Sequence, residues 1–157
     1  MKSLSELTLE RVLKLALNME EQSIKIYTSA QNKASNPSSE VLLKELVKEE
    51  EKHKSKILTA IRDPEKVKEI GSLGTKIYDL KIVDYLKDVD LAPDADYQQI
   101  LIYAGKREKE THDLYMGLAK KYRNKQIGKM FAQLAQEELK HKYELEKEYD
   151  DVVLKWM

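Results

Sequence analysis

The sequence contains no cysteine among its 157 residues. This absence excludes disulfide bonds, iron–sulfur clusters, thiolate-bound iron and a cysteine nucleophile from the chain. An excess of charge of either sign is also missing, because 28 basic residues balance 28 acidic ones. The composition therefore gives no general electrostatic reason to expect nucleic acid or an anionic membrane as a partner.

Long hydrophobic runs are missing as well. No uninterrupted apolar stretch approaches the roughly 20 residues that a membrane-spanning helix needs, and residues 1–6 lack the apolar core of a signal peptide. We therefore expect a cytoplasmic protein without a membrane partner. The length suits one domain, residues 1–157, which is large enough to bury a core.

Proline and glycine are scarce, and most of these residues lie where we expect the breaks between helices. The three prolines are Pro37, Pro64 and Pro93, and Gly71 and Gly74 lie between the last two. Outside this central part, apolar residues recur at steps of three and four, which is the spacing of one helix face. The pattern predicts four helices, at about 5–34, 37–61, 96–122 and 125–155.

The expected helix starts depend on side chains that can cap a helix N-terminus. Ser5 and Asn36 are candidate caps of the first two helices, and Asp94 or Asp96 precedes the third. Short loops pair the helices into antiparallel hairpins, residues 5–61 and 96–155. Residues 62–95 are long enough to cross a bundle of roughly 40 Å. We therefore expect an all-α four-helix bundle whose two hairpins are joined by a long, partly ordered crossover.

One short pattern occurs twice and interrupts the apolar stripes of the second and fourth helices. Glu50 and His53 stand three residues apart where a bundle normally places leucine, and Glu138 and His141 repeat them. A lone glutamate precedes each pair by 30 residues, and a tyrosine follows each lone glutamate by seven. Adding 88 to each number of the first set gives the second set: Glu20, Tyr27, Glu50 and His53, then Glu108, Tyr115, Glu138 and His141.

These residue types at this spacing indicate a site for two metal ions. Buried carboxylates are costly unless they are paired or metal-bound, and two divalent ions would neutralise four of them. Residues three apart on a helix are neighbours, so each Glu-x-x-His pair offers an oxygen and a nitrogen ligand to one ion. A glutamate from each of two helices, with a Glu-x-x-His pair from each of the other two, is the ligand set of carboxylate-bridged di-iron and di-manganese bundles.

The pattern also assigns a role to each residue. The expected metal ligands are Glu20, Glu50, His53, Glu108, Glu138 and His141. We expect Glu50 and Glu138 to bridge the ions, the other two glutamates to bind terminally, and each histidine to bind one ion through one ring nitrogen. The hydroxyls of Tyr27 and Tyr115 are expected to hydrogen-bond a ligand carboxylate. Mixed carboxylate and imidazole ligation suits redox-active iron or manganese.

The doubled residues resemble the ligand pattern of the rubrerythrin and ferritin-like di-iron family, helix by helix. The matching motifs are Glu20-x6-Tyr27, Glu50-x2-His53, Glu108-x6-Tyr115 and Glu138-x2-His141. The resemblance covers the four expected helices and hence most of the chain. It implies a ferritin-like bundle whose two irons, when reduced, react with hydrogen peroxide or dioxygen. At the level of the family it also implies a homodimer.

Two features depart from the pattern of a full rubrerythrin. A rubrerythrin carries a C-terminal rubredoxin domain that supplies electrons, whereas this chain has no cysteine and ends just after the fourth helix. We therefore expect a stand-alone di-iron domain with an external electron donor. Rubrerythrins also carry an extra glutamate one turn beyond Glu108, where this chain has Thr111, and Glu110 should face away. The six-ligand set is thus closer to the bacterioferritin type of centre.

Other polar residues near the pattern are expected to lie outside the site. The glutamates that flank the ligands are predicted to point into solvent: Glu21, Glu49, Glu51 and Glu137. His112, one turn beyond Glu108, is favoured as a surface or cavity histidine, with an extra ligand or a proton shuttle as the alternative.

The sequence therefore predicts a di-iron carboxylate oxidoreductase that reacts with hydrogen peroxide or dioxygen, or a ferroxidase. Three alternatives remain open: an iron-handling protein without independent turnover, a bundle whose metal only stabilises the fold, and a hydroxylase of an organic substrate. Manganese or a mixed pair of metals suits the same ligands as iron.

Overall fold

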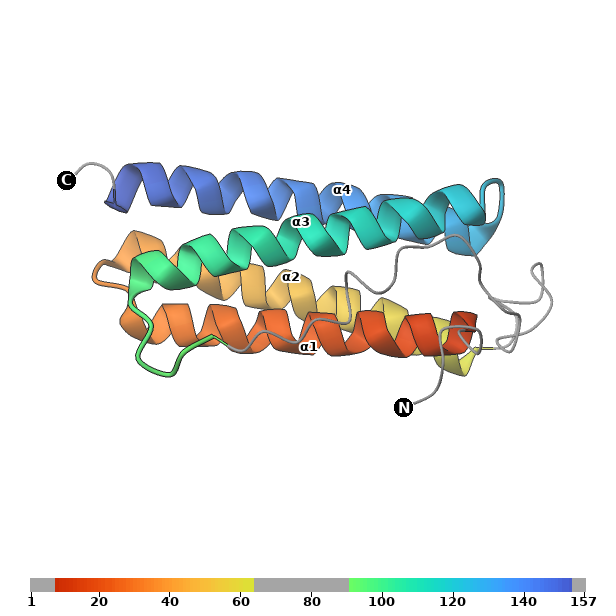
Figure 1. Cartoon of the computed structure of the whole chain (residues 1–157), viewed down its shortest axis with the longest axis horizontal. Coiled ribbons are helices and arrows are strands. Elements are labelled where there is room, and N and C mark those ends of the chain that lie inside the picture. Colours follow the sequence, from red (N-terminus) through yellow and green to blue (C-terminus); the bar gives the residue numbers. More distant parts are fainter. Residues whose placement is uncertain (1–7, 64–90, 154–157) are drawn as a thin grey trace.

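The chain folds into four long helices that lie side by side (Figure 1). The computed structural model describes residues 8–63 and 91–153. The helices are α1 (Leu9–Lys33), α2 (Pro37–Arg62), α3 (Tyr97–Lys121) and α4 (Gln126–Glu148), and a short π-helical segment, η4 (Tyr149–Val153), follows α4. No strand occurs in the described ranges. The predicted all-α, ferritin-like four-helix bundle is confirmed.

The helices pair as two hairpins, α1 with α2 and α3 with α4 (Figure 1). Helix α2 ends at one end of the bundle and α3 begins at the other (Figure 1). This is the topology expected for two hairpins joined by a long crossover. Most of the predicted crossover, including its apolar stretch 77–86, falls outside the described residues.

The first helix begins later than the sequence indicated. Its N-cap is Thr8, whose hydroxyl accepts a hydrogen bond from the backbone N–H of Arg11 at 3.3 Å. Ser5 itself lies outside the described residues. Threonine caps helices well, and Leu9, the first residue of α1, is fully buried in the bundle.

The caps of the second and third helices follow the sequence more closely. Asn36 caps α2, with Pro37 at its first position. Asp96, and not Asp94, caps α3, because Gln99 completes a reciprocal capping box with it. Among the described helices, none is both long enough and apolar enough to cross a membrane.

Helix α4 is shorter than predicted, because its α-helical geometry ends at Glu148. The buried carboxylate of Glu148 accepts hydrogen bonds from Ser39 Oγ at 2.5 Å and from the hydroxyl of Tyr97. The hydroxyl of Tyr149 accepts one from Gln98 at 2.9 Å. These contacts join the end of α4 to the first turns of α2 and α3, and the π-helical segment begins at this junction.

Two apolar clusters fill the bundle and leave a polar layer between them. One cluster, around Leu13, Ile57 and Phe131, occupies the end where α1 begins. The other, around Leu43 and Leu101, occupies the opposite end. Burial of these side chains is the main stabilising contribution to the bundle, and it holds the polar layer away from bulk water.

Gly128 marks a close approach of α4 to the preceding turn. A Cβ atom at this position would overlap the backbone carbonyl of Tyr122, whereas a Cβ atom at Gly105 of α3 would meet nothing within 4 Å. We expect Gly128→Ala to lower the free energy of unfolding by about 1–3 kcal/mol, because backbone has to move. The matched control Gly105→Ala should raise it by roughly 0.5–1 kcal/mol. Denaturant unfolding of the two variants measures both, and equal effects would contradict the close approach.

Candidate metal centre

The six predicted ligands meet in the polar layer. The lone glutamates project from α1 and α3, and the two Glu-x-x-His pairs project from α2 and α4. None of the six is more than 1% exposed: Glu20, Glu50, His53, Glu108, Glu138 and His141. So many ionisable groups are seldom buried together without charge compensation.

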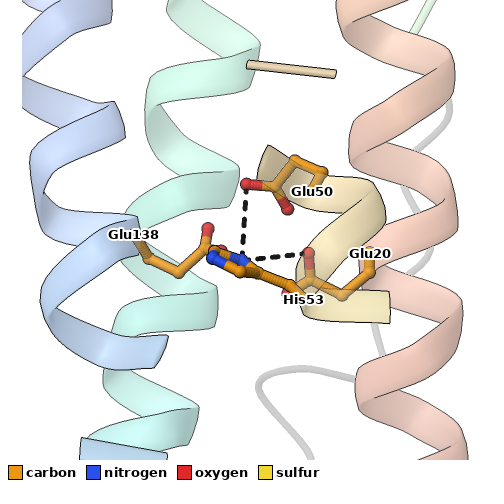
Figure 2. Close-up of side chains that lie close together, drawn as sticks. All are labelled: Glu20, Glu50, His53 and Glu138. Carbon is orange, nitrogen blue, oxygen red and sulfur yellow. Dashed lines mark hydrogen bonds and ion pairs between the residues drawn. The ribbon is translucent and has the colours of Figure 1, made fainter. Parts of the chain in front are cut away.

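The cluster divides into two overlapping sets of four residues. The first set is Glu20, Glu50, His53 and Glu138, and Figure 2 shows these side chains converging from α1, α2 and α4. The second set is Glu50, Glu108, Glu138 and His141. In each set the ligand atoms lie within 4.8 Å of one another. Glu50 and Glu138 belong to both sets, so these two carboxylates would hold both ions if each set bound one.

Each histidine presents the same ring nitrogen to the carboxylates. His53 Nδ1 lies 2.6 Å from Glu138 Oε1 and 3.6 Å from Glu20 Oε2. His141 Nδ1 lies 2.7 Å from Glu50 Oε1 without the geometry of a hydrogen bond. The two imidazole rings are stacked, with centroids 5.6 Å apart and planes inclined by 16°. In both rings, therefore, Nδ1 is the atom available to a metal.

The donor atoms fit two metal ions. Six buried ligand atoms have no hydrogen-bond partner: Glu20 Oε2, both carboxylate oxygens of Glu50, Glu108 Oε2, Glu138 Oε2 and His141 Nδ1. A buried polar atom without a partner costs free energy. Two divalent cations would supply partners for these atoms and balance the four carboxylates. The set of oxygens and imidazole nitrogens suits iron or manganese.

Without metal, protons provide part of this compensation. The pKa of Glu50 and that of Glu138 lie well above the usual value, because burial disfavours the charged form and neighbouring carboxylates repel it. Burial would also raise the pKa of Glu20, but hydrogen bonds from its neighbours lower it. Burial alone would lower the pKa of His141, but the carboxylates of Glu108 and Glu50 raise it to about 11. Protons and metal ions thus compete for the same ligand atoms.

The two tyrosines of the repeat connect the hairpins across the cluster. Tyr27 of α1 donates a hydrogen bond from its hydroxyl to Glu108 of α3. Tyr115 of α3 donates one to Glu20 of α1 at 2.6 Å. The pKa of each phenol is raised well above its usual value by burial and by nearby carboxylates, so both remain neutral donors. Each tyrosine therefore fixes one oxygen of the lone glutamate that the other hairpin contributes.

Two flanking glutamates also reach the cluster, which corrects the expectation that all four point into solvent. Glu137 Oε2 lies 2.5 Å from His53 Nε2, and Glu49 accepts a hydrogen bond from His141 Nε2. Glu49 and Glu137 are only partly exposed, at 36% and 34%. The signal was present in the sequence, because positions 49 and 137 are also separated by 88. The other two flanking residues behave as predicted, since Glu21 pairs with Lys54 near the surface and Glu51 is exposed.

These two contacts should hold each ring with Nδ1 toward the cluster. A carboxylate that accepts the second ring N–H fixes the tautomer and orientation of a metal-binding histidine. We expect Glu49→Ala or Glu137→Ala to weaken metal affinity about 10–100-fold. Competition with a chelating indicator measures this affinity, and Glu51→Ala, on the exposed face of α2, is the control. Unchanged affinity in both variants would contradict a positioning role.

The remaining polar residues of α3 lie outside the cluster. Thr111 is buried, but its hydroxyl donates to the carbonyl of Arg107 at 2.9 Å. Glu110 is exposed, as its helical phase indicates. The side chain of His112 is 20% exposed, and its Nδ1 lies 3.2 Å from Oδ1 of the neighbouring Asp113. The described residues thus place six metal-type ligands in the cluster, with no additional carboxylate from α3.

The comparisons with known proteins concern the family and the fold of the chain. The family model for rubrerythrin matches residues 11–90 and 99–155. A solved structure of a hypothetical protein from Pyrococcus furiosus is similar in fold, with a TM-score of 0.69 and 22% sequence identity over 95% of this chain and 92% of that one. A search of curated proteins finds no match. On the strength of the family match and the four-helix bundle that carries the doubled ligand pattern, the chain belongs to the rubrerythrin family.

Proposed function

We propose that the cluster binds two iron ions and that the protein is a di-iron oxidoreductase acting on hydrogen peroxide or dioxygen. The observation that carries this proposal is the pair of overlapping four-residue sets that share Glu50 and Glu138. A single ion would need only one set. Two sets with two shared carboxylates are the arrangement that holds two ions close together.

A redox function follows from the ligand types. Two ferrous ions, when bound, supply two electrons, which is the number needed to reduce hydrogen peroxide to water. Four carboxylates balance the charge of two ferrous ions, and neutral imidazoles add no charge. Manganese or a mixed pair would occupy the same ligands.

The protein's own side chains prepare the site for this chemistry. Tyr27 and Tyr115 hold the lone glutamates in place from the opposite hairpin. Glu49 and Glu137 keep the imidazole rings oriented. The apolar clusters at both ends separate the polar layer from water, which strengthens electrostatic interactions inside it. Glu50 and Glu138 must release the protons that their raised pKa values favour before they bind cations.

An anaerobic titration of metal-free protein with ferrous iron tests the proposal. We expect two irons per chain, followed by rapid oxidation when hydrogen peroxide or dioxygen is mixed in separate stopped-flow runs. The faster oxidant distinguishes a peroxidase from an oxidase or ferroxidase. Binding of one iron, or oxidation no faster than that of free iron, would contradict a redox di-iron centre.

A ferroxidase that handles iron is the second candidate, and Thr111 favours it. The position one turn beyond Glu108 carries a hydroxyl bonded to the backbone instead of another carboxylate. Storage of iron requires a closed shell of many chains, whereas a homodimer with an external electron donor suits peroxide reduction. Sedimentation velocity separates these assemblies, because a dimer cannot enclose a mineral core.

A further inference from the structure

A groove of about 350 Å³ lies between α3 and α4, near the end of α4. Its apolar lining comes from Leu101 and Ile102 of α3, Leu145 of α4 and Tyr149 of η4. Ile102 is 42% exposed and so presents part of its apolar side chain to solvent. The volume is at the lower end of the range, about 300–1,000 Å³, of pockets that hold small organic molecules.

The groove exists because α3 offers no side chain at Gly105. A Cβ atom at this position would meet nothing within 4 Å, so the space beside the helix is open. Glycine in a helix interior costs roughly 0.5–1 kcal/mol relative to alanine. The glycine therefore opens the groove at some cost to the stability of the helix.

The α3 side of the groove carries two lysines that are available to a ligand. Lys106 and Lys109 line it, both are exposed, and neither forms an ion pair within the described ranges. On the α4 side, Lys142 is already bonded to Glu146. Glu146 of α4 and Asp150 of η4 also line the groove, so its negative charge lies on the side opposite α3. The groove thus combines an apolar wall with two free ammonium groups on its α3 side, which favours a ligand with an apolar body whose anionic end lies toward α3.

The groove is also close to the metal centre along both helices. Lys109 directly follows Glu108, and Lys142 directly follows His141. Leu145 is one helical turn beyond His141. Electron transfer slows steeply with distance, so a donor bound here would be separated from the cluster by little protein.

We propose that this groove binds a flavin nucleotide and that the reduced flavin is an electron donor to the centre. The isoalloxazine ring fits the apolar wall, where Tyr149 can stack on it, and the phosphate fits between Lys106 and Lys109. Binding of the flavin depends only on the groove, whereas its role as a donor rests on the proposed oxidoreductase function.

The overall oxidation of reduced flavin by hydrogen peroxide is balanced in electrons and protons. A reduced flavin carries two electrons and two protons in excess of its oxidised form. One hydrogen peroxide accepts two electrons and two protons and yields two water molecules. One reduced flavin is therefore oxidised for each peroxide consumed, and no further reductant is needed.

Flavin mononucleotide binding to the full metal-free chain, followed by quenching of flavin fluorescence, tests the site without reference to activity. We expect Gly105→Leu, which fills the groove, and the double variant Lys106→Glu/Lys109→Glu each to weaken binding about tenfold or more. Riboflavin, which lacks the phosphate, should bind more weakly and be insensitive to the lysine changes. The charge-matched control Lys120→Glu/Lys121→Glu, in the last turn of α3, should leave binding unchanged.

Absence of flavin binding, or equal binding in all variants, would overturn the inference. Binding of decanoate that depends on Gly105, without binding of flavin, would overturn the assigned ligand class. In iron-loaded protein, peroxide should oxidise reduced flavin more slowly in Gly105→Leu than in the parent. With dithionite as the donor, the two proteins should turn over at the same rate. This pair of results supports the donor role. If dithionite supports no turnover either while flavin still binds, the proposed function fails and the binding site remains.

Discussion

Replacing Glu50 and Glu138 together by alanine is expected to abolish binding of both metal ions and all metal-dependent oxidation. Each of these residues belongs to both four-residue sets. Loss of the pair leaves each ion with one lone glutamate and one histidine, and removes two of the four negative charges that balance the cations. No other pair of residues in the cluster is shared in this way.

The measurement is iron stoichiometry by anaerobic titration, together with the rate of oxidation by peroxide and by dioxygen. A drop from two irons per chain to none is the expected result, and turnover should fall to the rate of free iron. Retained metal-dependent turnover in a folded double variant would refute the assigned centre. Glu51→Ala/Glu110→Ala removes the same number of carboxylates from exposed positions and should bind iron normally.

A second double variant separates loss of metal from loss of fold. Glu50→Gln/Glu138→Gln keeps the side-chain volume but removes both titratable groups. Because the metal-free protein must hold these two carboxyls buried and close to other carboxylates, their neutral replacements should leave the metal-free bundle at least as stable as the parent. Added metal should then stabilise the parent protein and not the variant.

Metal-free protein is expected to lose stability as the pH rises from about 6.5 to 9. The pKa of Glu50 and that of Glu138 are raised in the folded state, so their stabilising contribution is complete below the ordinary value of 4.5 and is lost as the pH rises through the folded values. His141 acts in the same direction, because its contribution is complete below 6.5 and is lost toward the folded value of about 11.

Glu20 acts in the opposite direction, but in another pH range. Its pKa is lowered below 4.5 in the folded state, so its contribution is present above that pH and is lost as the pH falls. It therefore does not offset the decline at neutral and alkaline pH. Over a pH range where a group is protonated in the folded state but deprotonated in the unfolded state, the free energy of unfolding falls by about 1.4 kcal/mol per pH unit. For a domain of this size, this fall lowers the melting temperature by roughly 3–6 °C per pH unit.

Thermal unfolding of metal-free protein across this pH range measures the slope. The glutamine double variant is the control, and its slope should be shallower because two of the three groups no longer titrate. Metal affinity should change in the opposite direction and increase with pH, since binding displaces these protons. If the melting temperature of the metal-free protein stays constant or rises from pH 6.5 to 9, the folded metal-free protein does not retain protons on the cluster, and the prediction is wrong.

The amino-acid sequence by itself determined the bundle and the six residues that meet at its centre. Helical periodicity placed Glu50 and His53 on the inward face of one helix and Glu138 and His141 on that of another, and the interval of 88 showed that the two hairpins are equivalent. Capping chemistry located the start of α2 at Asn36 correctly. These features depend on contacts within one helix or one turn, which is why local sequence could predict them.

Only the tertiary structure decided which side chains act on each other across the two hairpins. Helical phase puts Glu49 and Glu137 to one side of the inward face, and whether that side meets solvent or a neighbouring helix depends on how α2 packs against α4. The same packing brings each tyrosine within hydrogen-bond distance of the lone glutamate of the other hairpin. It also turns Nδ1 of each histidine toward the cluster. Contacts between residues more than 80 positions apart depend on the relative rotation and spacing of whole helices, and no local pattern in the chain encodes either quantity.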